Sequence, residues 1–123
     1  MTGAQILRGM VIGGDMTEDE LLAGITEALT FGGWRWTHIR RSDGITVGMA
    51  GLPDIIAVHP ERGLALTWEL KSTNGRPTLE QYAWLHGFDR VEGIDARVIY
   101  PIDYDAALEV ILRGADPVAV FGG

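Results

Sequence analysis

The order of apolar and polar positions along the chain predicts alternating helices and strands. In the helical segments apolar residues recur every three or four positions, whereas the strand segments are rich in β-branched and aromatic residues. Helices are expected over 17–33, 78–88 and 104–114. Strands are expected over 34–41, 54–60, 63–71 and 95–101. The tail over 115–123 fits either a short strand or a loose end.

This order, α-β-β-β-α-β-α, predicts an α/β fold in which helices flank a mixed central sheet. No repeat, low-complexity tract or linker interrupts the 123 residues, so one domain is expected over 1–123. Its core should span about 17–113, with 1–16 and 114–123 as flanking segments. The four tryptophans are expected in the core rather than as platforms for base stacking. They are Trp34, Trp36, Trp68 and Trp84.

The first helix carries an acid on its apolar side. At 100° per residue its apolar residues form one arc that should face the sheet. That arc holds Leu21, Leu22, Ile25, Ala28 and Leu29. Glu18 falls within the arc, whereas Glu20 and Glu27 fall on the opposite side. A carboxylate on a buried stripe needs a partner, so Glu18 is a candidate metal ligand; alternatively, it favours the positive end of the helix dipole and stays in water.

Composition narrows the class of protein. Hydrophobic residues make up 46% of the chain, which favours a globular domain, and there is no cysteine to form disulfides or thiolates. No segment has the apolar length of a signal peptide core or a membrane span, so a cytoplasmic location without membrane contact is expected. The net charge of -7 at first opposes a nucleic-acid partner.

The charge is unevenly distributed along the sequence. Between Trp34 and Arg76 there are six basic and four acidic residues, which gives +2. The remainder has four basic and thirteen acidic residues, which gives -9. An uneven distribution can arise by chance, and a cation that neutralised Asp54 and Glu69 would make this segment more basic still.

The most informative segment is the strand "GLALTWELK", which ends in the only lysine of the chain. Alternation places Glu69 and Lys71 on one face of this strand, and Asp54 begins the preceding strand. If the two strands are neighbours, the two carboxylates approach each other and favour a bound Mg²⁺ or Mn²⁺. A lysine beside that cation can orient or deprotonate a water, which a guanidinium cannot do. Alternatively, Glu69 and Lys71 form a simple surface ion pair.

These residues resemble the catalytic pattern of the PD-(D/E)XK nucleases. "GLPD" followed by "WELKSTNGRPTLEQYAWL" is similar to the virus-type replication-repair nuclease branch, the VRR-NUC domain, in its small phage-type form. The resemblance covers about Thr17 to Pro101 and includes "TEDEL" and "GWRWTHIRR". It implies a restriction-endonuclease-like fold and Mg²⁺-dependent hydrolysis of DNA phosphodiester bonds.

The resemblance also assigns roles. Asp54, Glu69 and Glu18 would hold the metal, Lys71 would place the attacking water, and Gln81 would line the site. Gln81 also fits a helix-capping pair with Thr78. Candidates for contact with DNA are the basic residues near these positions. They are His38, Arg40, Arg41 and Arg76.

By the same resemblance, stand-alone VRR-NUC domains act as homodimers on branched DNA such as Holliday junctions. Junction resolution is therefore the first expectation, and cutting at flaps or nicks is the nearest alternative. A non-catalytic binding or assembly module on the same fold is a different class of function. The complete set of Asp54, Glu69 and Lys71 favours the enzyme, because a decayed copy would have lost at least one of the three.

Overall fold

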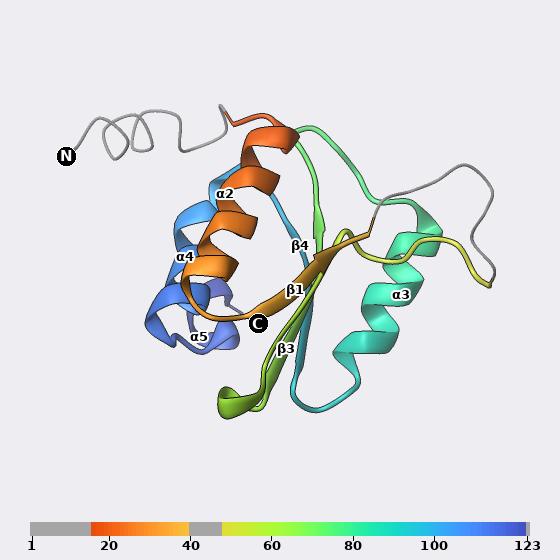
Figure 1. The fold of residues 1–123 in the computed structure, drawn as a ribbon. Coiled ribbons are helices and arrows are strands. Elements are labelled where there is room, and N and C mark those ends of the chain that lie inside the picture. Colours follow the sequence, from red (N-terminus) through yellow and green to blue (C-terminus); the bar gives the residue numbers. More distant parts are fainter. Residues whose placement is uncertain (1–15, 40–47, 123) are drawn as a thin grey trace.

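The computed structural model describes residues 16–39 and 48–122 and places helices on both sides of one sheet (Figure 1). The strands are β1 (Arg35–His38), β2 (Ile55–His59), β3 (Leu64–Leu70) and β4 (Ile94–Ile99). The helices are α2 (Glu18–Phe31), α3 (Leu79–Asp89), α4 (Tyr104–Arg113) and α5 (Pro117–Phe121), with 3₁₀ turns at Pro60–Arg62 and Pro101–Asp103. The expected order of elements is confirmed, with α5 added at its end.

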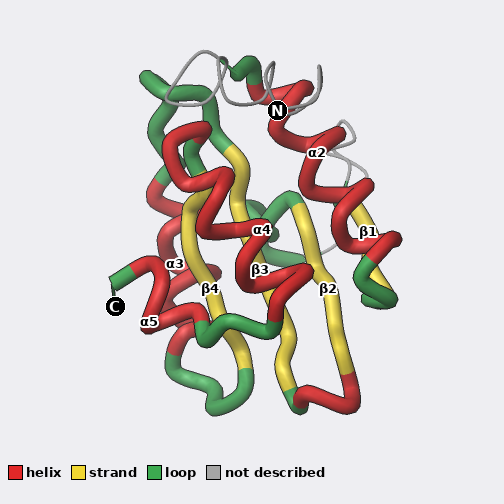
Figure 2. Tube along the Cα trace, turned by 90° about the vertical axis from the view of Figure 1, so that its left-hand side faces the viewer, coloured by secondary structure: helices red, strands yellow, loops and turns green. Residues whose placement is uncertain are grey.

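The sheet is mixed, as expected from the sequence. Its strand order is β1-β2-β3-β4; the first three strands are antiparallel, and β4 runs parallel to β3. The parallel pair requires a crossover, which α3 provides by running back between β3 and β4. Helices α2, α4 and α5 lie on one side of the sheet and α3 lies on the other (Figures 1 and 2).

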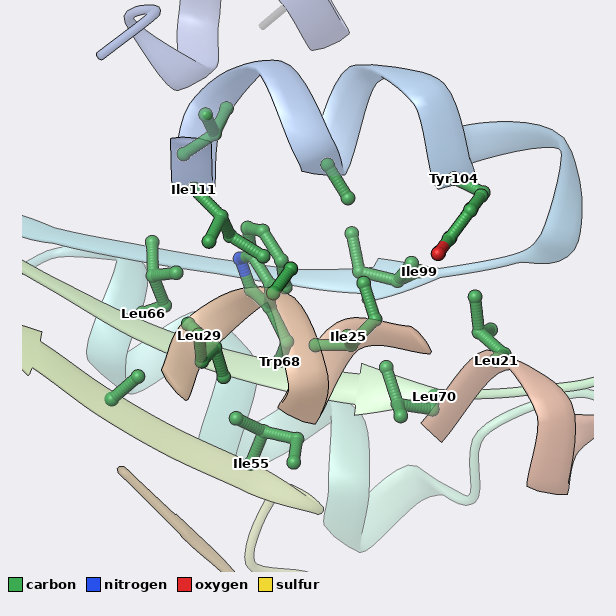
Figure 3. Packing of buried hydrophobic residues seen from close by; sticks show 14 of the residues in the cluster. Leu21, Ile25, Leu29, Ile55, Leu66, Trp68, Leu70, Ile99, Tyr104 and Ile111 are labelled. Atoms are coloured by element: carbon green, nitrogen blue, oxygen red, sulfur yellow. The ribbon is translucent and has the colours of Figure 1, made fainter. Parts of the chain in front are cut away.

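The hydrophobic core lies between the sheet and the α2–α4 pair, as Figure 3 shows. Strand β3 contributes Leu66, Trp68 and Leu70 to it, on the face opposite to Glu69, as the alternation along this strand requires. Helix α2 contributes Leu21, Ile25, Ala28 and Leu29, the buried members of the expected arc. The other face of β3, which carries Glu69, is not part of this core.

Helices α2 and α3 both begin with reciprocal caps. The Thr17 hydroxyl accepts from the Glu20 amide, and the Glu20 carboxylate accepts from the Thr17 amide. Thr78 and Gln81 make the same pair of bonds at the start of α3. Each cap contributes on the order of 1 kcal/mol and fixes the residue at which its helix begins.

The tryptophan prediction is correct for Trp34 and Trp68, which are buried. It is wrong for Trp36, which lies on the outermost strand β1, is 36% exposed and donates from its indole to Thr30. Trp84 is half-buried and stacks on Phe88 along α3. Strand alternation predicts which face a side chain takes, but an outermost strand lacks a neighbour on one side to cover it.

The C-terminal tail is a helix, so neither a strand nor a loose end is correct. Asp116 caps α5 by accepting from the Ala119 amide, and Pro117 occupies the first turn, where a missing N–H costs nothing. Phe121 then packs edge-on against Trp68 and lies 4.1 Å beneath the Arg97 guanidinium. The short helix is held by these tertiary contacts, because five residues alone would not stay helical in water.

Candidate functional site

Asp54 and Glu69 meet where β2 begins and β3 ends. The antiparallel register pairs Ile55 with Trp68, and one further step places Asp54 opposite Glu69. Residues directly opposite each other in an antiparallel pair share a face of the sheet. The sequence-based expectation that the two carboxylates lie on neighbouring strands is therefore confirmed.

The Asp54 side chain is held in place by the backbone of β3. Its Oδ2 accepts a hydrogen bond of 2.8 Å from the Leu70 amide. That amide points toward β2, just beyond the last paired residues, so the carboxylate takes the position that a ladder carbonyl would otherwise fill. This hydrogen bond fixes the Asp54 side chain against Leu70, the residue between Glu69 and Lys71.

Glu69 is a fully buried carboxylate with a lysine beside it. Its exposure is 0%, and the Lys71 Nζ lies 3.2 Å from its Oε2. The Lys71 side chain retains 17% exposure, so the ammonium lies between the buried acid and solvent. A surface ion pair, the alternative that the sequence left open, would not have a carboxylate with no exposed area. Taking a charged pair out of water costs free energy even when its two groups attract each other, which favours a functional reason for the burial of Glu69.

The loop after β3 holds the Lys71 side chain. A Cβ at Gly75 would lie 3.3 Å from both Cβ and Cδ of Lys71, so the glycine allows this close approach. The Gly75 carbonyl accepts from the Tyr100 hydroxyl at 3.2 Å, and its amide donates to the Ser72 carbonyl. Tyr100, which follows β4, therefore positions the loop that packs on the lysine.

Helix α3 brings Gln81 to the same face of the sheet. Gln81 and Leu85 are the buried residues of this helix, which packs on β3 and β4. The Gln81 Oε1 caps Thr78, whereas its buried Nε2 has no hydrogen-bond partner within the described residues. The capping role is confirmed. Its role in lining the site stays a prediction. A buried amide donor such as the Gln81 Nε2 is suited to that role.

The loop before Asp54 is tightly packed on α3. Gly51 has φ +100°, and a Cβ there would lie 2.6 Å from the Glu80 carbonyl carbon. The Ala50 carbonyl accepts from the Trp84 indole at 2.9 Å. These contacts join the segment that leads into Asp54 to the first turns of the helix that carries Gln81.

Gly51→Ala is expected to disturb this junction strongly. The variant adds a backbone clash to the roughly 1–2 kcal/mol that a left-handed conformation costs a residue with a side chain. Gly63 is a matched control, because its φ is +62° but a Cβ there would meet nothing within 4 Å. Thermal unfolding should show a clearly lower Tm for Gly51→Ala than for Gly63→Ala. Equal shifts in Tm would mean that the Glu80 backbone moves easily to accommodate the added methyl group.

Asp54 and Glu69 are the pair of acids that the register brings together as a candidate site for a divalent cation. Within the described parts of the chain, no group of three or more His, Cys, Asp or Glu side chains is placed to hold a metal ion. Two carboxylates still suit Mg²⁺, which is commonly held by one or two acids together with water and phosphate oxygens of the substrate. A set of two acids is therefore compatible with the expected metal, and among residues 16–39 and 48–122 no third carboxylate joins them.

Glu18 was expected on the buried stripe of α2, and this is wrong because its side chain is exposed. It is the first residue of the helix, and helical side chains tilt toward the N-terminus, so the carboxylate extends past the first turn into solvent. Glu20 and Glu27 are exposed, as expected. The proposed role of Glu18 as a metal ligand rested on that burial, so the exposed side chain leaves the role without support.

We expect Glu18→Gln to leave metal-dependent cleavage close to the wild-type rate, because a solvated carboxylate outside the site is easily replaced. Glu27→Gln, also exposed on α2, is the control. The measurement is the single-turnover rate at saturating Mg²⁺ on folded variants. A loss confined to Glu18→Gln would return this residue to the ligand set.

The candidate contacts with DNA fall in different places. His38 pairs with Ile55, a core residue, so it lies on the face of the sheet opposite to Glu69 and is half-buried. Arg76 is exposed in the loop after Lys71 and donates to the Gly75 carbonyl. Arg40 and Arg41 lie outside the described residues. Of the two described residues, Arg76 directly follows Gly75, the residue that packs against Lys71.

Sequence reasoning did not select Tyr100. The parallel register pairs Leu70 with Ile99, so Lys71 and Tyr100 are the next residues along their two strands. The sequence alone does not contain this register, because α3 separates the strands and the offset between them depends on how that helix packs.

Comparison with known proteins supports the fold. A solved structure described as a VRR_NUC domain superposes with a TM-score of 0.59 at 21% identity, over 76% of this chain and 97% of that chain. No protein-family model and no curated protein matches the sequence. At this level of identity the likeness concerns architecture, and it agrees with the resemblance seen in the motifs. The chain has the restriction-endonuclease-like fold of a VRR_NUC domain.

Proposed function

We propose that the protein is a metal-dependent nuclease that hydrolyses DNA phosphodiester bonds. The observation that carries the proposal is the placement of Asp54 opposite Glu69, with the Lys71 Nζ 3.2 Å from the buried Glu69 carboxylate. The likeness to a VRR_NUC domain, a nuclease domain by name, supports this class of chemistry. Within the described residues no helix has the length and apolarity to cross a membrane.

In this proposal Asp54 and Glu69 hold Mg²⁺, and Mn²⁺ can replace it. The cation supplies a Lewis acid for the scissile phosphate and lowers the pKa of a bound water. Lys71 helps to position or deprotonate the attacking water and stabilises charge that develops on the phosphate. Asp54 stays in position because the Leu70 amide holds one of its oxygens.

The proposed substrate is branched DNA, with a Holliday junction as the first candidate and flaps or nicks as the second. Two symmetric cuts need two sites, so the acting form would be a homodimer. Arg76 is the described basic residue best placed to contact the backbone, since it is exposed on the loop that follows Lys71. The net charge of -7 makes local basic groups more important, because the rest of the surface repels phosphate.

One assay tests this proposal most directly. The protein is incubated with a four-way junction, a flap, linear duplex and single strands, each with Mg²⁺ and with excess chelator. Cleavage of branched substrates is expected only with the metal, because the acids alone cannot stabilise the additional negative charge of the transition state. Efficient cutting in chelator would rule out the metal mechanism. Metal-dependent binding without cutting would favour the non-catalytic module on this fold.

A further inference from the structure

A groove runs along α3 beside the candidate site. One wall is formed by residues 49–50, in the segment that leads into Asp54, and the other by the side of α3 that carries Trp84 (Figure 1). Its volume is about 640 Å³, within the range of about 300–1,000 Å³ that sites for small molecules occupy. The described side chains that line it are apolar, apart from Glu80. Such a lining suits a ligand that is largely uncharged.

Two aromatic rings on α3 line the groove. Trp84 and Phe88 stack with their centroids 5.6 Å apart and their planes inclined by 29°. The Trp84 indole donates a hydrogen bond of 2.9 Å to the Ala50 carbonyl, which fixes the ring between the two walls. Neither ring belongs to the hydrophobic core, which lies on the other side of the sheet. A fixed aromatic surface of this kind is what unpaired bases stack on in proteins that bind single-stranded DNA.

Gly87 keeps the groove open. It lies within α3 and lines the groove, and a Cβ at this position would meet nothing within 4 Å. Glycine in a helix is less stable than alanine, and the φ of Gly87 is not positive. Neither the backbone conformation nor packing among the described residues therefore requires a glycine here. A ligand in the groove would account for the missing side chain.

Charge and position indicate which ligand the groove takes. Glu80 in its lining repels a phosphate, whereas an uncharged base is not repelled. Both walls continue into the candidate site, because residues 49–50 lead into Asp54 and Glu80 directly precedes Gln81. Trp84 follows Gln81 by less than one turn of the helix. A DNA strand with its phosphate beside Asp54 can therefore place a neighbouring base in the groove.

We propose that the groove between α3 and residues 49–50 binds an unpaired nucleobase of the DNA substrate, held against Trp84 with the phosphates outside. The inference rests on the proposed function and adds that the substrate carries an unpaired base beside the bond that is cut. Bases within a duplex are stacked and paired, so their faces are not available to a protein. A flap offers an unpaired base, whereas a fully paired junction must first open a base pair. Trp84 thus gains the base-stacking role that the sequence analysis did not expect.

The first test compares two single-stranded oligonucleotides that share their phosphates and differ in their bases. One is a short oligothymidylate, and in the other abasic residues replace the thymidines. Fluorescence anisotropy in excess chelator measures both affinities without cleavage. The wild-type protein should bind the oligothymidylate at least about tenfold more tightly, as expected for a base stacked on an aromatic side chain. Equal affinities would show that only phosphates are bound and would overturn the proposal.

Two variants locate this preference in the groove. Gly87→Leu fills the groove, and Trp84→Leu keeps its apolar character but removes the indole. Each should bind the two oligonucleotides with equal affinity. Trp36→Leu is the matched control, because Trp36 is a partly exposed tryptophan on β1 that donates to Thr30 of α2, on the other side of the sheet. It should keep the preference for the oligothymidylate.

Gly87→Leu decides the test even if Trp84→Leu fails to fold. Its Cβ has open space, and leucine favours a helix more than glycine does, so the Tm should not fall. A Gly87→Leu protein that still prefers the oligothymidylate would overturn the proposal. Sedimentation equilibrium checks for a second copy as the occupant. If Gly87→Leu abolishes self-association and leaves the preference for bases unchanged, the groove is an interface between copies and the proposal is wrong.

The binding result is separable from the cleavage assay, because it is obtained without Mg²⁺. Metal-dependent cleavage by a protein with no preference for bases would overturn the base-binding groove and leave the proposed nuclease intact. A preference for bases that Gly87→Leu removes, without cleavage in Mg²⁺, would support the groove and overturn the nuclease.

Discussion

Lys71→Arg is expected to bind branched DNA with nearly wild-type affinity and to cleave it at least about 100-fold more slowly. Arginine keeps the positive charge, but its guanidinium does not release a proton at physiological pH and presents a rigid planar head group. The space is also restricted, because the lysine side chain already lies against Gly75 and its Nζ is 3.2 Å from the Glu69 carboxylate. This one substitution thus separates the contribution of the Lys71 charge to DNA binding from the contribution of Lys71 to cleavage.

The measurement pairs a binding titration in Ca²⁺ with single-turnover cleavage in Mg²⁺. Arg76→Lys is the matched control, because it exchanges the same two side chains at an exposed position in the following loop. It should change binding slightly and cleavage no more than binding. A Lys71→Arg variant that cuts at the wild-type rate would reduce Lys71 to an electrostatic contact.

The second large effect is expected for Glu69→Gln, which should abolish both cleavage and stabilisation by metal. A cation that binds only the folded protein raises the Tm in proportion to its affinity. Removing the buried carboxylate leaves Asp54 as the remaining acid of the pair, so a Mg²⁺-induced shift in the wild-type Tm should disappear. This measurement requires neither DNA nor turnover, so it reports on the metal site itself.

Glu61→Gln is the control for this experiment, because the Glu61 side chain is 90% exposed and lies in the turn between β2 and β3. It should retain the full Mg²⁺-induced shift. Asp54→Asn should lose most of the Mg²⁺-induced shift in Tm, because Asp54 lies directly opposite Glu69. Retention of the shift in Glu69→Gln would indicate that the cation binds elsewhere and that the acids have another role.

Much of the fold was predictable because the signals are local. The alternation along β3 separates Trp68 from Glu69, and the reciprocal caps at Thr17 and Thr78 mark two helix starts. The placement of Asp54 beside Glu69 required one further assumption, that consecutive strands pair as neighbours, and the register confirms it.

The residues that the sequence predicted wrongly or missed depend on contacts between elements, which local sequence patterns do not contain. Helical phase placed Glu18 in the apolar arc but did not show that its side chain, on the first residue of the helix, is exposed. The face of His38 depends on the register of β1 against β2, and the role of Tyr100 depends on the offset across the α3 crossover. These are properties of packing between elements distant in the sequence.

The hydrogen bonds at the end of β3 have a consequence for the chain during its synthesis. Lys71 is held through its amide by the Ile99 carbonyl, and its loop is held by the Tyr100 hydroxyl. Asp54, Glu69, Lys71 and Gln81 are all translated before either of these anchors. A nascent chain on the ribosome therefore carries every proposed catalytic group while the last strand that orders them is still missing. We expect hydrolytic competence to be acquired late, when β4 docks, which would protect nearby nucleic acid from partly folded copies.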